Sequence, residues 1–286
     1  VPEARPDDHE GKRVFGVSQE QKTFDSGYVA PHPGIARDVL ATAPPEVKES
    51  YMEHHIWYDK AYLESVHPVH LPPKNLADRV GLAAVRFMRS CFDRATGYGP
   101  NMTEAKWLQR TIFLETVAGV PGMVAGMLRH LRSLRAFRTD KGWIHCLLEE
   151  AENERMHLLT FLQMRQPGAL FRFFVIGAQG VFFNLYFIVY LLWPKVCHSF
   201  VGYLEEEAVR TYTHLISDID NNKVWKNKPA PKIAKEYWCL PEDATMRDLI
   251  LAVRADEACH SHVNHTLKTL APDDPNPFVM GKSQAP

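Results

Sequence analysis

Two glutamate–histidine pairs are the residues in this sequence best suited to do chemistry. Glu154 and His157 lie in "NERMHL", and Glu257 and His260 lie in "ADEACH". Residues three apart share one face of an α-helix. A carboxylate and an imidazole on an apolar helix face cost free energy unless they are paired or bind a metal. The spacing of both pairs therefore indicates either buried acid–base partners or metal ligands.

A third Glu-x-x-His match, Glu64 and His67, differs in its context. Pro68 follows the histidine, and the segment around it has the composition of a loop, so we interpret this match as accidental. The sequence has no HExxH motif, which disfavours a zinc protease.

Two single glutamates complete a larger pattern. Glu115 lies in the apolar stretch "TIFLETVAGVPG", and Glu205 begins the acidic run of "YLEEEAV". The chain thus gives a lone carboxylate and then a Glu-x-x-His pair, twice over, which is the ligand set of a di-iron carboxylate site in a four-helix bundle. Mixed oxygen and nitrogen ligands with open positions suit iron that binds O2. Asn153 and Asp256, each just before a paired glutamate, are candidates to orient the ligand imidazoles.

Four long helices are needed to bring these residues together. The hydrophobic periodicity predicts such helices over 104–137, 141–165, 195–220 and 244–269. Pro121 is expected to kink the first of them, and a further helix is expected over 75–92, with Asn75 as its N-cap.

The predicted fold is all-α, a four-helix bundle of the di-iron carboxylate (ferritin-like) type with additional in-plane membrane-anchoring helices. Its domain is expected to span 75–270. An extended N-terminal arm (1–74) precedes it, and a Pro-rich C-terminal tail (271–286) follows it.

The segment 173–193 contains no charged residue and is long enough to cross a membrane. Two of the ligand glutamates precede it and two follow it, so a crossing would divide one metal site between the two sides of a bilayer. We therefore expect either a buried core helix or an in-plane anchor. The aromatic content and the flanking Arg172 and Lys195 favour an anchor. Arginines recur at every third position from 129 to 138. This stripe either contacts anionic lipid headgroups or faces solvent: Arg129, Arg132, Arg135 and Arg138.

Charge and cysteine content exclude other classes of protein. The formal net charge of −1 gives no support for binding to nucleic acid. The five cysteines lie far apart and form no CxxC pair, so a disulfide framework or a zinc knuckle is not expected. A reducing compartment fits this pattern better.

Four motifs resemble those of the alternative oxidases, the cyanide-insensitive ubiquinol oxidases of mitochondria: "LETVAGVPGMV" (114–124), "NERMHL" (153–158), "LEEEA" (204–208) and "RADEACH" (254–260). The resemblance covers about 75–270, and the stretch 108–135 is most similar to the trypanosomal members. It implies a non-haem enzyme with two iron ions that passes electrons from ubiquinol to O2 and makes water without pumping protons. It also implies a monotopic homodimer on the lipid surface at the matrix face of the inner mitochondrial membrane.

The resemblance implies roles for particular residues as well. The iron ligands are Glu115, Glu154, His157, Glu205, Glu257 and His260, with Glu154 and Glu257 as bridges. The redox-active tyrosine of the family falls on Tyr212. The quinol pocket maps onto Arg89, Arg110, Leu114, Leu204, Glu207, Ala208 and Thr211.

Two other functions share some of these features. A membrane-bound di-iron hydroxylase of quinone biosynthesis would use the same ligands and the same membrane mode, but its product is a hydroxylated ring. An iron-storing bundle would not need the apolar segment 173–193.

The chain departs from many family members at Cys259, where they have histidine. It has no cysteine before Cys91, so the thiol regulation of the plant enzymes is not expected.

Overall fold

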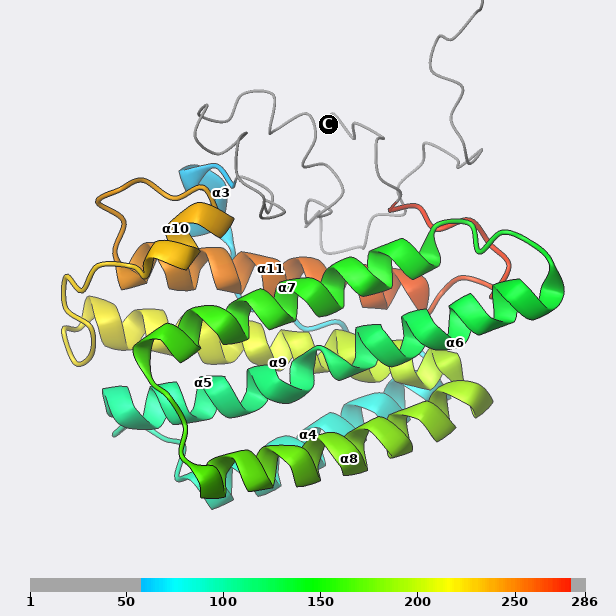
Figure 1. Ribbon diagram of the computed structural model, residues 1–286, viewed down its shortest axis with the longest axis horizontal. Helices are drawn as coiled ribbons and strands as arrows, with labels where there is room; N and C mark the ends of the chain where they lie inside the picture. Colours follow the sequence, from blue (N-terminus) through cyan, green and yellow to red (C-terminus); the bar gives the residue numbers. More distant parts are fainter. Residues whose placement is uncertain (1–57, 279–286) are drawn as a thin grey trace, which may run out of the picture.

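The structure, a computed structural model, describes residues 58–278 (Figure 1). Its helices are α3 (Lys60–Ser65), α4 (Leu76–Thr96), α5 (Glu104–Ala118), α6 (Val120–Ala136), α7 (Trp143–Met164), α8 (Ala169–Leu192), α9 (Pro194–Asp220), α10 (Lys232–Tyr237) and α11 (Met246–Leu267). The predicted all-α fold is therefore confirmed. Most of the predicted N-terminal arm and the end of the predicted tail lie outside the described residues.

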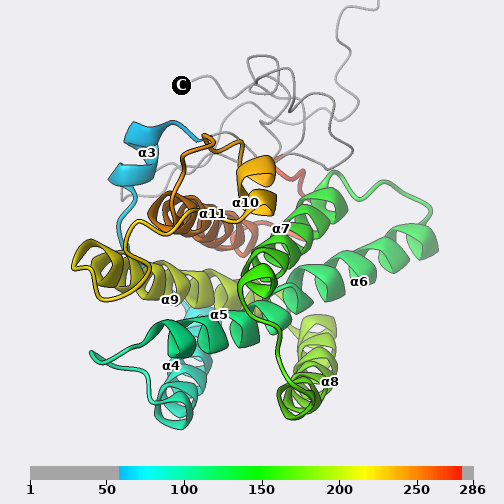
Figure 2. The ribbon, with the colours of Figure 1, turned by 60° about the vertical axis from the view of Figure 1, so that its left-hand side comes forward.

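Four of these helices, α5, α7, α9 and α11, form the bundle that the ligand pattern requires. α5 packs on α7 and α9 packs along α11, and the two pairs lie against each other (Figure 1). Figures 1 and 2 both show the short helices α3 and α10 on one side of this bundle and α4 and α8 on the opposite side. The bundle thus has a face covered by short elements and a face covered by two long helices.

Local sequence signals set the starts of two helices. The side chain of Asn75 accepts a hydrogen bond from the Asp78 amide at 2.9 Å, which confirms the predicted N-cap of α4. Thr245 and Asp248 form a reciprocal capping box at the start of α11, the helix that carries Glu257 and His260.

The helix expected over 104–137 is two helices, α5 and α6, separated at Gly119. Pro121 lies in the first turn of α6. Proline has no amide hydrogen, and its ring clashes with the carbonyl four residues earlier in a continuous helix. The expected kink is therefore a break between two helices.

Two glycines allow neighbouring helices to approach closely. A Cβ atom on Gly122 in α6 would lie 2.5 Å from the backbone oxygen of Leu147 in α7. A Cβ atom on Gly81 in α4 would lie 2.8 Å from the backbone nitrogen of Phe200 in α9. Side chains cannot come so near to a backbone atom, so only glycine fits where α6 meets α7 and where α4 meets α9.

The apolar segment 173–193 lies within α8, which exposes most of its surface. Two helical runs are long and apolar enough to cross a membrane, α8 and the combined run of α5 and α6. About half of the apolar window in the combined run is buried inside the protein, compared with 11% in α8. The alternative of a buried core helix for 173–193 is therefore wrong. Tyr186 and Tyr190 are exceptions on this helix, since both side chains are buried against the bundle.

The stripe of four arginines does not form one free face. Arg129 is buried and pairs with Asp140 at 2.8 Å. Arg132 pairs with Asp273 at 3.0 Å, so it contacts the segment that follows α11. Arg138, at the end of the stripe, also lies 4.0 Å from Asp273, so the free basic surface is smaller than the sequence predicts.

Parts of the predicted arm and tail also pack on the bundle. α3, in the range predicted as arm, contacts α11. After α11, the Asn276 amide donates to the Lys141 carbonyl at 3.1 Å, and the Trp143 indole donates to the Asp274 carbonyl at 2.8 Å. These contacts hold the described segments before α4 and after α11 against the bundle.

Candidate metal centre

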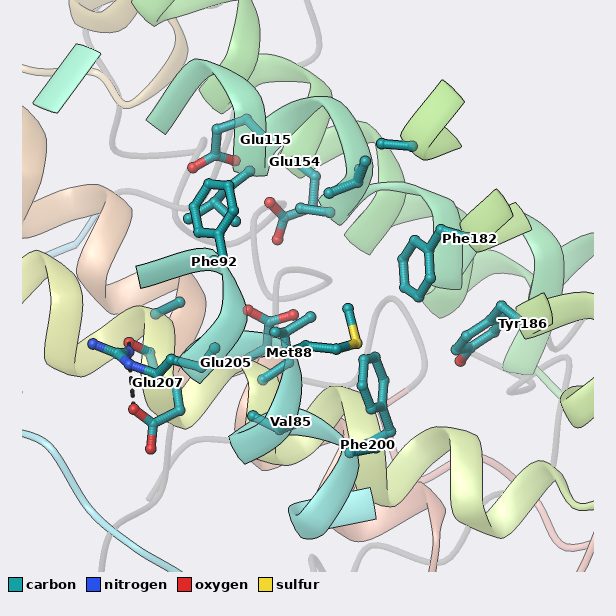
Figure 3. Close-up of a pocket in the computed structure, with 18 of the residues that line it drawn as sticks. Val85, Met88, Phe92, Glu115, Glu154, Phe182, Tyr186, Phe200, Glu205 and Glu207 are labelled. Atoms are coloured by element: carbon teal, nitrogen blue, oxygen red, sulfur yellow. Dashed lines mark hydrogen bonds and ion pairs between the residues drawn. The ribbon is translucent and has the colours of Figure 1, made fainter. Parts of the chain in front are cut away.

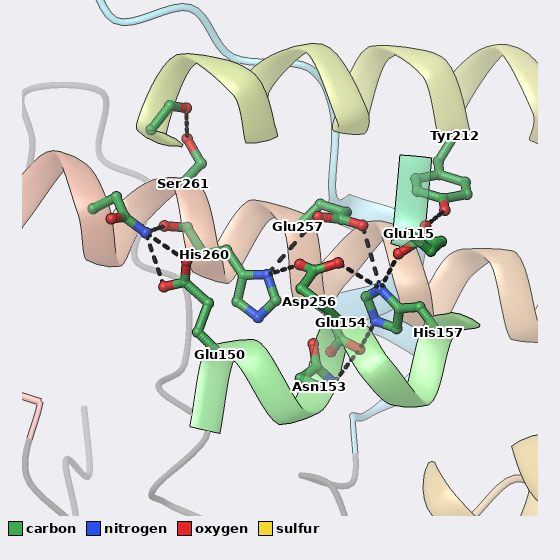
Figure 4. Close-up of polar contacts among 12 residues, drawn as sticks. Glu115, Glu150, Asn153, Glu154, His157, Tyr212, Asp256, Glu257, His260 and Ser261 are labelled. Atoms are coloured by element: carbon green, nitrogen blue, oxygen red, sulfur yellow. Dashed lines mark hydrogen bonds and ion pairs between the residues drawn. The ribbon is translucent and has the colours of Figure 1, made fainter. Parts of the chain in front are cut away.

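The six predicted ligands lie together in the middle of the bundle, and each is at most 6% exposed. Ligand atoms of Glu115, Glu154, His157 and Glu257 all lie within 4.8 Å of one another (Figure 4). These four side chains come from three helices, α5, α7 and α11. The tertiary structure therefore brings together residues that are up to 142 positions apart in the chain.

The other two predicted ligands lie beside this group. The Nδ1 atom of His260 lies 2.8 Å from Oε1 of Glu154. The carboxyl of Glu205, from α9, shares a hydrogen bond with Glu257. Glu154 and Glu257 each contact both histidines, since Glu257 lies 3.4 Å from His157 and 3.8 Å from His260.

The donor atoms of this cluster fit a bound divalent metal. Among the residues of the described range, several buried atoms have no well-directed hydrogen bond: Glu115 Oε2, both Glu154 oxygens, Glu257 Oε2, His157 Nδ1 and His260 Nδ1. Uncompensated buried carboxylates cost several kcal/mol each, on the order of 5, and bound cations remove that cost. Carboxylate and imidazole donors without thiolates suit iron better than structural zinc.

The same burial controls the protonation of the cluster. Burial raises the pKa of Glu115 to about 8, although its contact with His157 opposes the rise. Burial and the charge of Glu257 also raise the pKa of Glu205. Burial acts in the same direction on Glu154, but its close contacts with His157 at 3.5 Å and His260 at 2.8 Å outweigh it and hold the pKa of Glu154 below its usual range. The metal-free centre therefore retains protons that cations displace.

Asp256 holds the imidazole of His157 in place. Its Oδ2 accepts hydrogen bonds from His157 Nε2 at 3.0 Å and from Trp238 Nε1 at 2.8 Å. Its Oδ1 accepts from the hydroxyl of Tyr58 at 2.7 Å. Because Nε2 of His157 donates to a carboxylate, Nδ1 is left to face the glutamates (Figure 4).

Three of these contacts did not follow from the sequence. Asn153, a candidate to orient an imidazole, instead donates to Asp256 at 3.1 Å and to the Tyr237 hydroxyl at 3.0 Å. Tyr58 and Trp238 lie 198 and 18 residues from Asp256, and no motif signals their role. Tyr58 lies just before α3, which contacts α11, and Trp238 lies just after α10, which contacts α7.

Tyr212 lies against the cluster on the side of Glu115. Its hydroxyl donates to Glu115 Oε1, and the side chain is 4% exposed (Figure 4). Burial raises the pKa of this phenol, and the charge of Glu115 raises it further. The phenol is therefore protonated and in direct contact with a predicted ligand.

A cavity of about 600 Å³ extends from the cluster toward α4 and α8 (Figure 3). Four predicted ligands and Tyr212 line one part of it. All seven predicted quinol-pocket residues line it as well: Arg89, Arg110, Leu114, Leu204, Glu207, Ala208 and Thr211. Most of the remaining wall is apolar, from side chains such as Met88, Phe182 and Phe200.

Two arginines supply the polar part of this cavity. Arg110, which is 3% exposed, pairs with Asp93 at 2.5 Å. Arg89 pairs with Glu207 at 2.8 Å and with the same Asp93 at 3.2 Å, and it donates to the Thr211 hydroxyl at 3.1 Å. Asp93 was not among the residues predicted from the sequence. Its position four residues after Arg89, the spacing of a helical ion pair, is the signal that points to it.

Comparisons with known proteins agree with this geometry. A family model described as "Alternative oxidase" matches residues 58–269. The mitochondrial alternative oxidase of Ajellomyces capsulatus is 52% identical over 260 residues, which cover 83% of this chain and 73% of that protein. The one of Monilinia fructicola is 55% identical over 240 residues, which cover 75% of this chain and 67% of that protein.

These relatives are fungal, as is the mitochondrial alternative oxidase of Blumeria graminis, which is 50% identical over 93% of this chain and 78% of its own length. The expected likeness to trypanosomal members in particular is therefore not confirmed. The match covers the whole bundle, from Tyr58 to the end of α11. This chain thus belongs to the alternative oxidase family and is an enzyme, a ubiquinol:oxygen oxidoreductase.

Proposed function

We propose that ubiquinol is oxidised in the cavity of Figure 3 and that O2 is reduced to water at a centre of two iron ions beside it. The observation that carries this proposal is that one cavity is lined both by predicted iron ligands and by the two arginines. Glu115, Glu154, His157, Glu205, Glu257 and His260 would hold the iron. Iron supplies one-electron chemistry and sites for O2. Glu154 and Glu257 suit the bridging role because each contacts both histidines.

The cavity has polar groups for the oxygens of a quinol and apolar walls for its ring and tail. Arg110 Nε has no hydrogen bond within the described range, so this nitrogen is available to a quinone oxygen. Thr211 and Glu207 lie beside the second arginine and can bind a hydroxyl group of the ring. The apolar side chains on the walls suit the ring faces and the isoprenoid tail.

Tyr212 lies between the substrate and the iron ligands in this proposal. It lines the cavity and donates its phenolic proton to Glu115 Oε1. A phenol in this place can pass one electron toward the metal centre while Glu115 takes and returns its proton. The hydrogen bond keeps the proton within reach, which makes the tyrosine the residue that we propose as redox-active.

The test is ubiquinol-dependent oxygen consumption by the iron-loaded protein in detergent, in the presence of cyanide. We expect two ubiquinols oxidised per O2, with loss of consumption after Glu205→Ala or His260→Ala. Glu64→Ala is the matched control, because Glu64 belongs to the third Glu-x-x-His match and pairs with Arg247 on the surface. Absence of consumption by folded, iron-loaded protein, or full activity without iron, would contradict the proposal.

A di-iron hydroxylase of quinone biosynthesis, the alternative that the sequence left open, would have the same ligands and apolar cavity, but the family match favours the oxidase. The product distinguishes the two. Mass spectrometry of the quinone after turnover in 18O2 would show unchanged ring mass for the oxidase and added oxygen for the hydroxylase.

We also propose that the enzyme binds a lipid surface through α4 and α8, as a monotopic homodimer on the matrix face of the inner mitochondrial membrane. The two helices lie on the same side of the bundle and expose large apolar side chains, among them Leu76 and Phe87 of α4 and Phe173 and Ile176 of α8. The cavity extends between them, so a lipid-soluble quinol would reach Arg110 without crossing water. The named mitochondrial location of the relatives supports this proposal.

A further inference from the structure

The two histidine ligands are held in different ways. Nε2 of His157 donates to Asp256 at 3.0 Å. His260 also turns Nδ1 toward the glutamates, 2.8 Å from Glu154, but its buried Nε2 has no hydrogen bond to any residue in 58–278. A metal-bound imidazole generally donates its second N–H to a carboxylate or carbonyl, which fixes the ring. One half of the site has this acceptor in place, and the other half lacks it.

A buried carboxylate lies near His260, one turn before Glu154 on α7. Both oxygens of Glu150 accept hydrogen bonds from the side-chain nitrogen of Asn264, at 3.0 and 2.8 Å. The same nitrogen donates to the backbone oxygen of His260 at 3.1 Å (Figure 4). Glu150 and the His260 ring also interact electrostatically. No lysine or arginine within residues 58–278 forms an ion pair with Glu150, so its charge has no other partner of opposite sign there.

Asn264 is itself fixed by a chain of buried groups. Since its nitrogen donates to Glu150, its oxygen is the acceptor for His198 Nδ1 at 3.0 Å. Nε2 of His198 then accepts from the hydroxyl of Tyr190 at 3.2 Å. The chain runs from α8 through α9 and α11 to α7. It holds Glu150 beside the site although this glutamate is not one of the six ligands.

We propose that Glu150 is the positioning residue for His260, as Asp256 is for His157. One nitrogen of Asn264 links the Glu150 carboxylate to the backbone oxygen of His260, and the charge of this carboxylate acts on the His260 ring. Asp256 is held by four donors, whereas Glu150 is held by one amide nitrogen. The iron ion on the His260 side is therefore bound less firmly than the one on the His157 side. This inference rests on the proposed di-iron centre.

The test is the release of iron to a chelator from the full chain in detergent, after anaerobic loading with ferrous iron. The parent protein should hold two ions and release them in two phases. Glu150→Gln should speed one phase about 10- to 100-fold, the usual effect of losing such a hydrogen-bond partner, and Asp256→Asn should speed the other. The glutamine keeps an acceptor for Asn264, so we expect this variant to fold.

Asp218→Asn is the matched control. Asp218 is buried on α9 and contacts Trp107 and Lys223, far in sequence from the ligands, so this variant should release both ions at the parent rates. Mössbauer spectra of protein loaded with 57Fe should show one of two iron signals altered by Glu150→Gln and the other by Asp256→Asn.

Equal acceleration of both phases by Glu150→Gln, or no acceleration, would overturn the inference, since a purely structural role would not select one ion. If the glutamine variant fails to fold, Glu150→Asp decides, because it keeps the charge but withdraws it by one methylene. It should speed the same single phase, and parent-like release would count against the inference. A parent protein that binds no iron would instead refute the di-iron centre itself.

Discussion

Tyr212 makes the contact on which the proposed electron path depends, and its hydroxyl is the only part of the side chain that the path needs. Tyr212→Phe keeps the buried ring but removes the donor to Glu115. We expect turnover to fall at least 100-fold while iron content stays at the parent level, because an oriented proton-transfer group contributes about 10²–10⁴-fold. Steady-state oxygen consumption and an iron assay measure both quantities.

Tyr203→Phe is the control for that experiment. Tyr203 lies on the same helix and is 1% exposed, and its hydroxyl has no hydrogen bond to residues 58–278. This variant should keep its turnover. Equal losses in the two variants would mean that the tyrosine hydroxyls matter for packing and not for electron transfer.

His198 gives the protein a stability that depends on pH. Burial lowers the pKa of its imidazole to about 4, below the unfolded value of about 6.5. Between these two values the unfolded chain binds more protons than the folded protein, so the free energy of unfolding rises with pH and the contribution is complete above pH 6.5.

His198→Gln should remove that contribution. The slope of unfolding free energy against pH between 4 and 6.5 should fall by about 1.4 kcal/mol per pH unit relative to the parent, the value for one proton. Denaturant unfolding of the metal-free protein at a series of pH values measures the slope. Identical slopes would show that His198 is protonated inside the folded protein.

At the scale of helices, backbone approach at Gly122 sets the distance between α6 and α7. Gly122→Ala would place a methyl group 2.5 Å from the Leu147 carbonyl, and two packed backbones cannot yield cheaply. We expect a loss of about 1–3 kcal/mol, typical of overpacking. Gly177→Ala on α8 is the control, because a Cβ atom added there would have no neighbouring atom within 4 Å.

The control variant should keep its free energy of unfolding or gain up to about 1 kcal/mol, because alanine is more favourable than glycine inside a helix. Thermal unfolding of both variants in the same detergent compares them directly. A stable Gly122→Ala protein would mean that α6 can move away from α7 without loss.

At the scale of the whole molecule, the proposed binding to a lipid surface depends on the exposed apolar side chains of α8. Phe173 and Ile176 are each 69% exposed. Phe173→Glu together with Ile176→Glu should lower the partition of the protein into vesicles at least 10-fold, because charged side chains are costly in the acyl region of a bilayer. Sedimentation with vesicles that contain cardiolipin measures the partition.

A control variant carries two glutamates on a different exposed apolar surface. Leu134→Glu with Phe137→Glu, at the end of α6, adds charge to residues that are 57% and 96% exposed. This variant should bind vesicles as the parent does. Equal weakening by both double variants would show that net charge, and not α8, controls binding.

The helices and the ligands followed from the sequence because helix periodicity is local. The three-residue spacing was enough to pair Glu154 with His157 and Glu257 with His260. All four side chains are buried, as a metal site requires. Local rules also predicted the cap at Asn75. These local rules predicted only a kink at Pro121. The structure instead has a break between α5 and α6, at Gly119.

By itself, the sequence determined which residues are candidates to bind metal, in which order they occur on four helices, and that segment 173–193 does not divide them. Only the tertiary structure decided the partners of those residues. Asp256 and not Asn153 meets an imidazole, Asp93 joins two arginines, and Glu150 lies near His260. The physical reason is that hydrogen bonds between helices depend on how side chains far apart in the chain approach one another, and no local period encodes that distance.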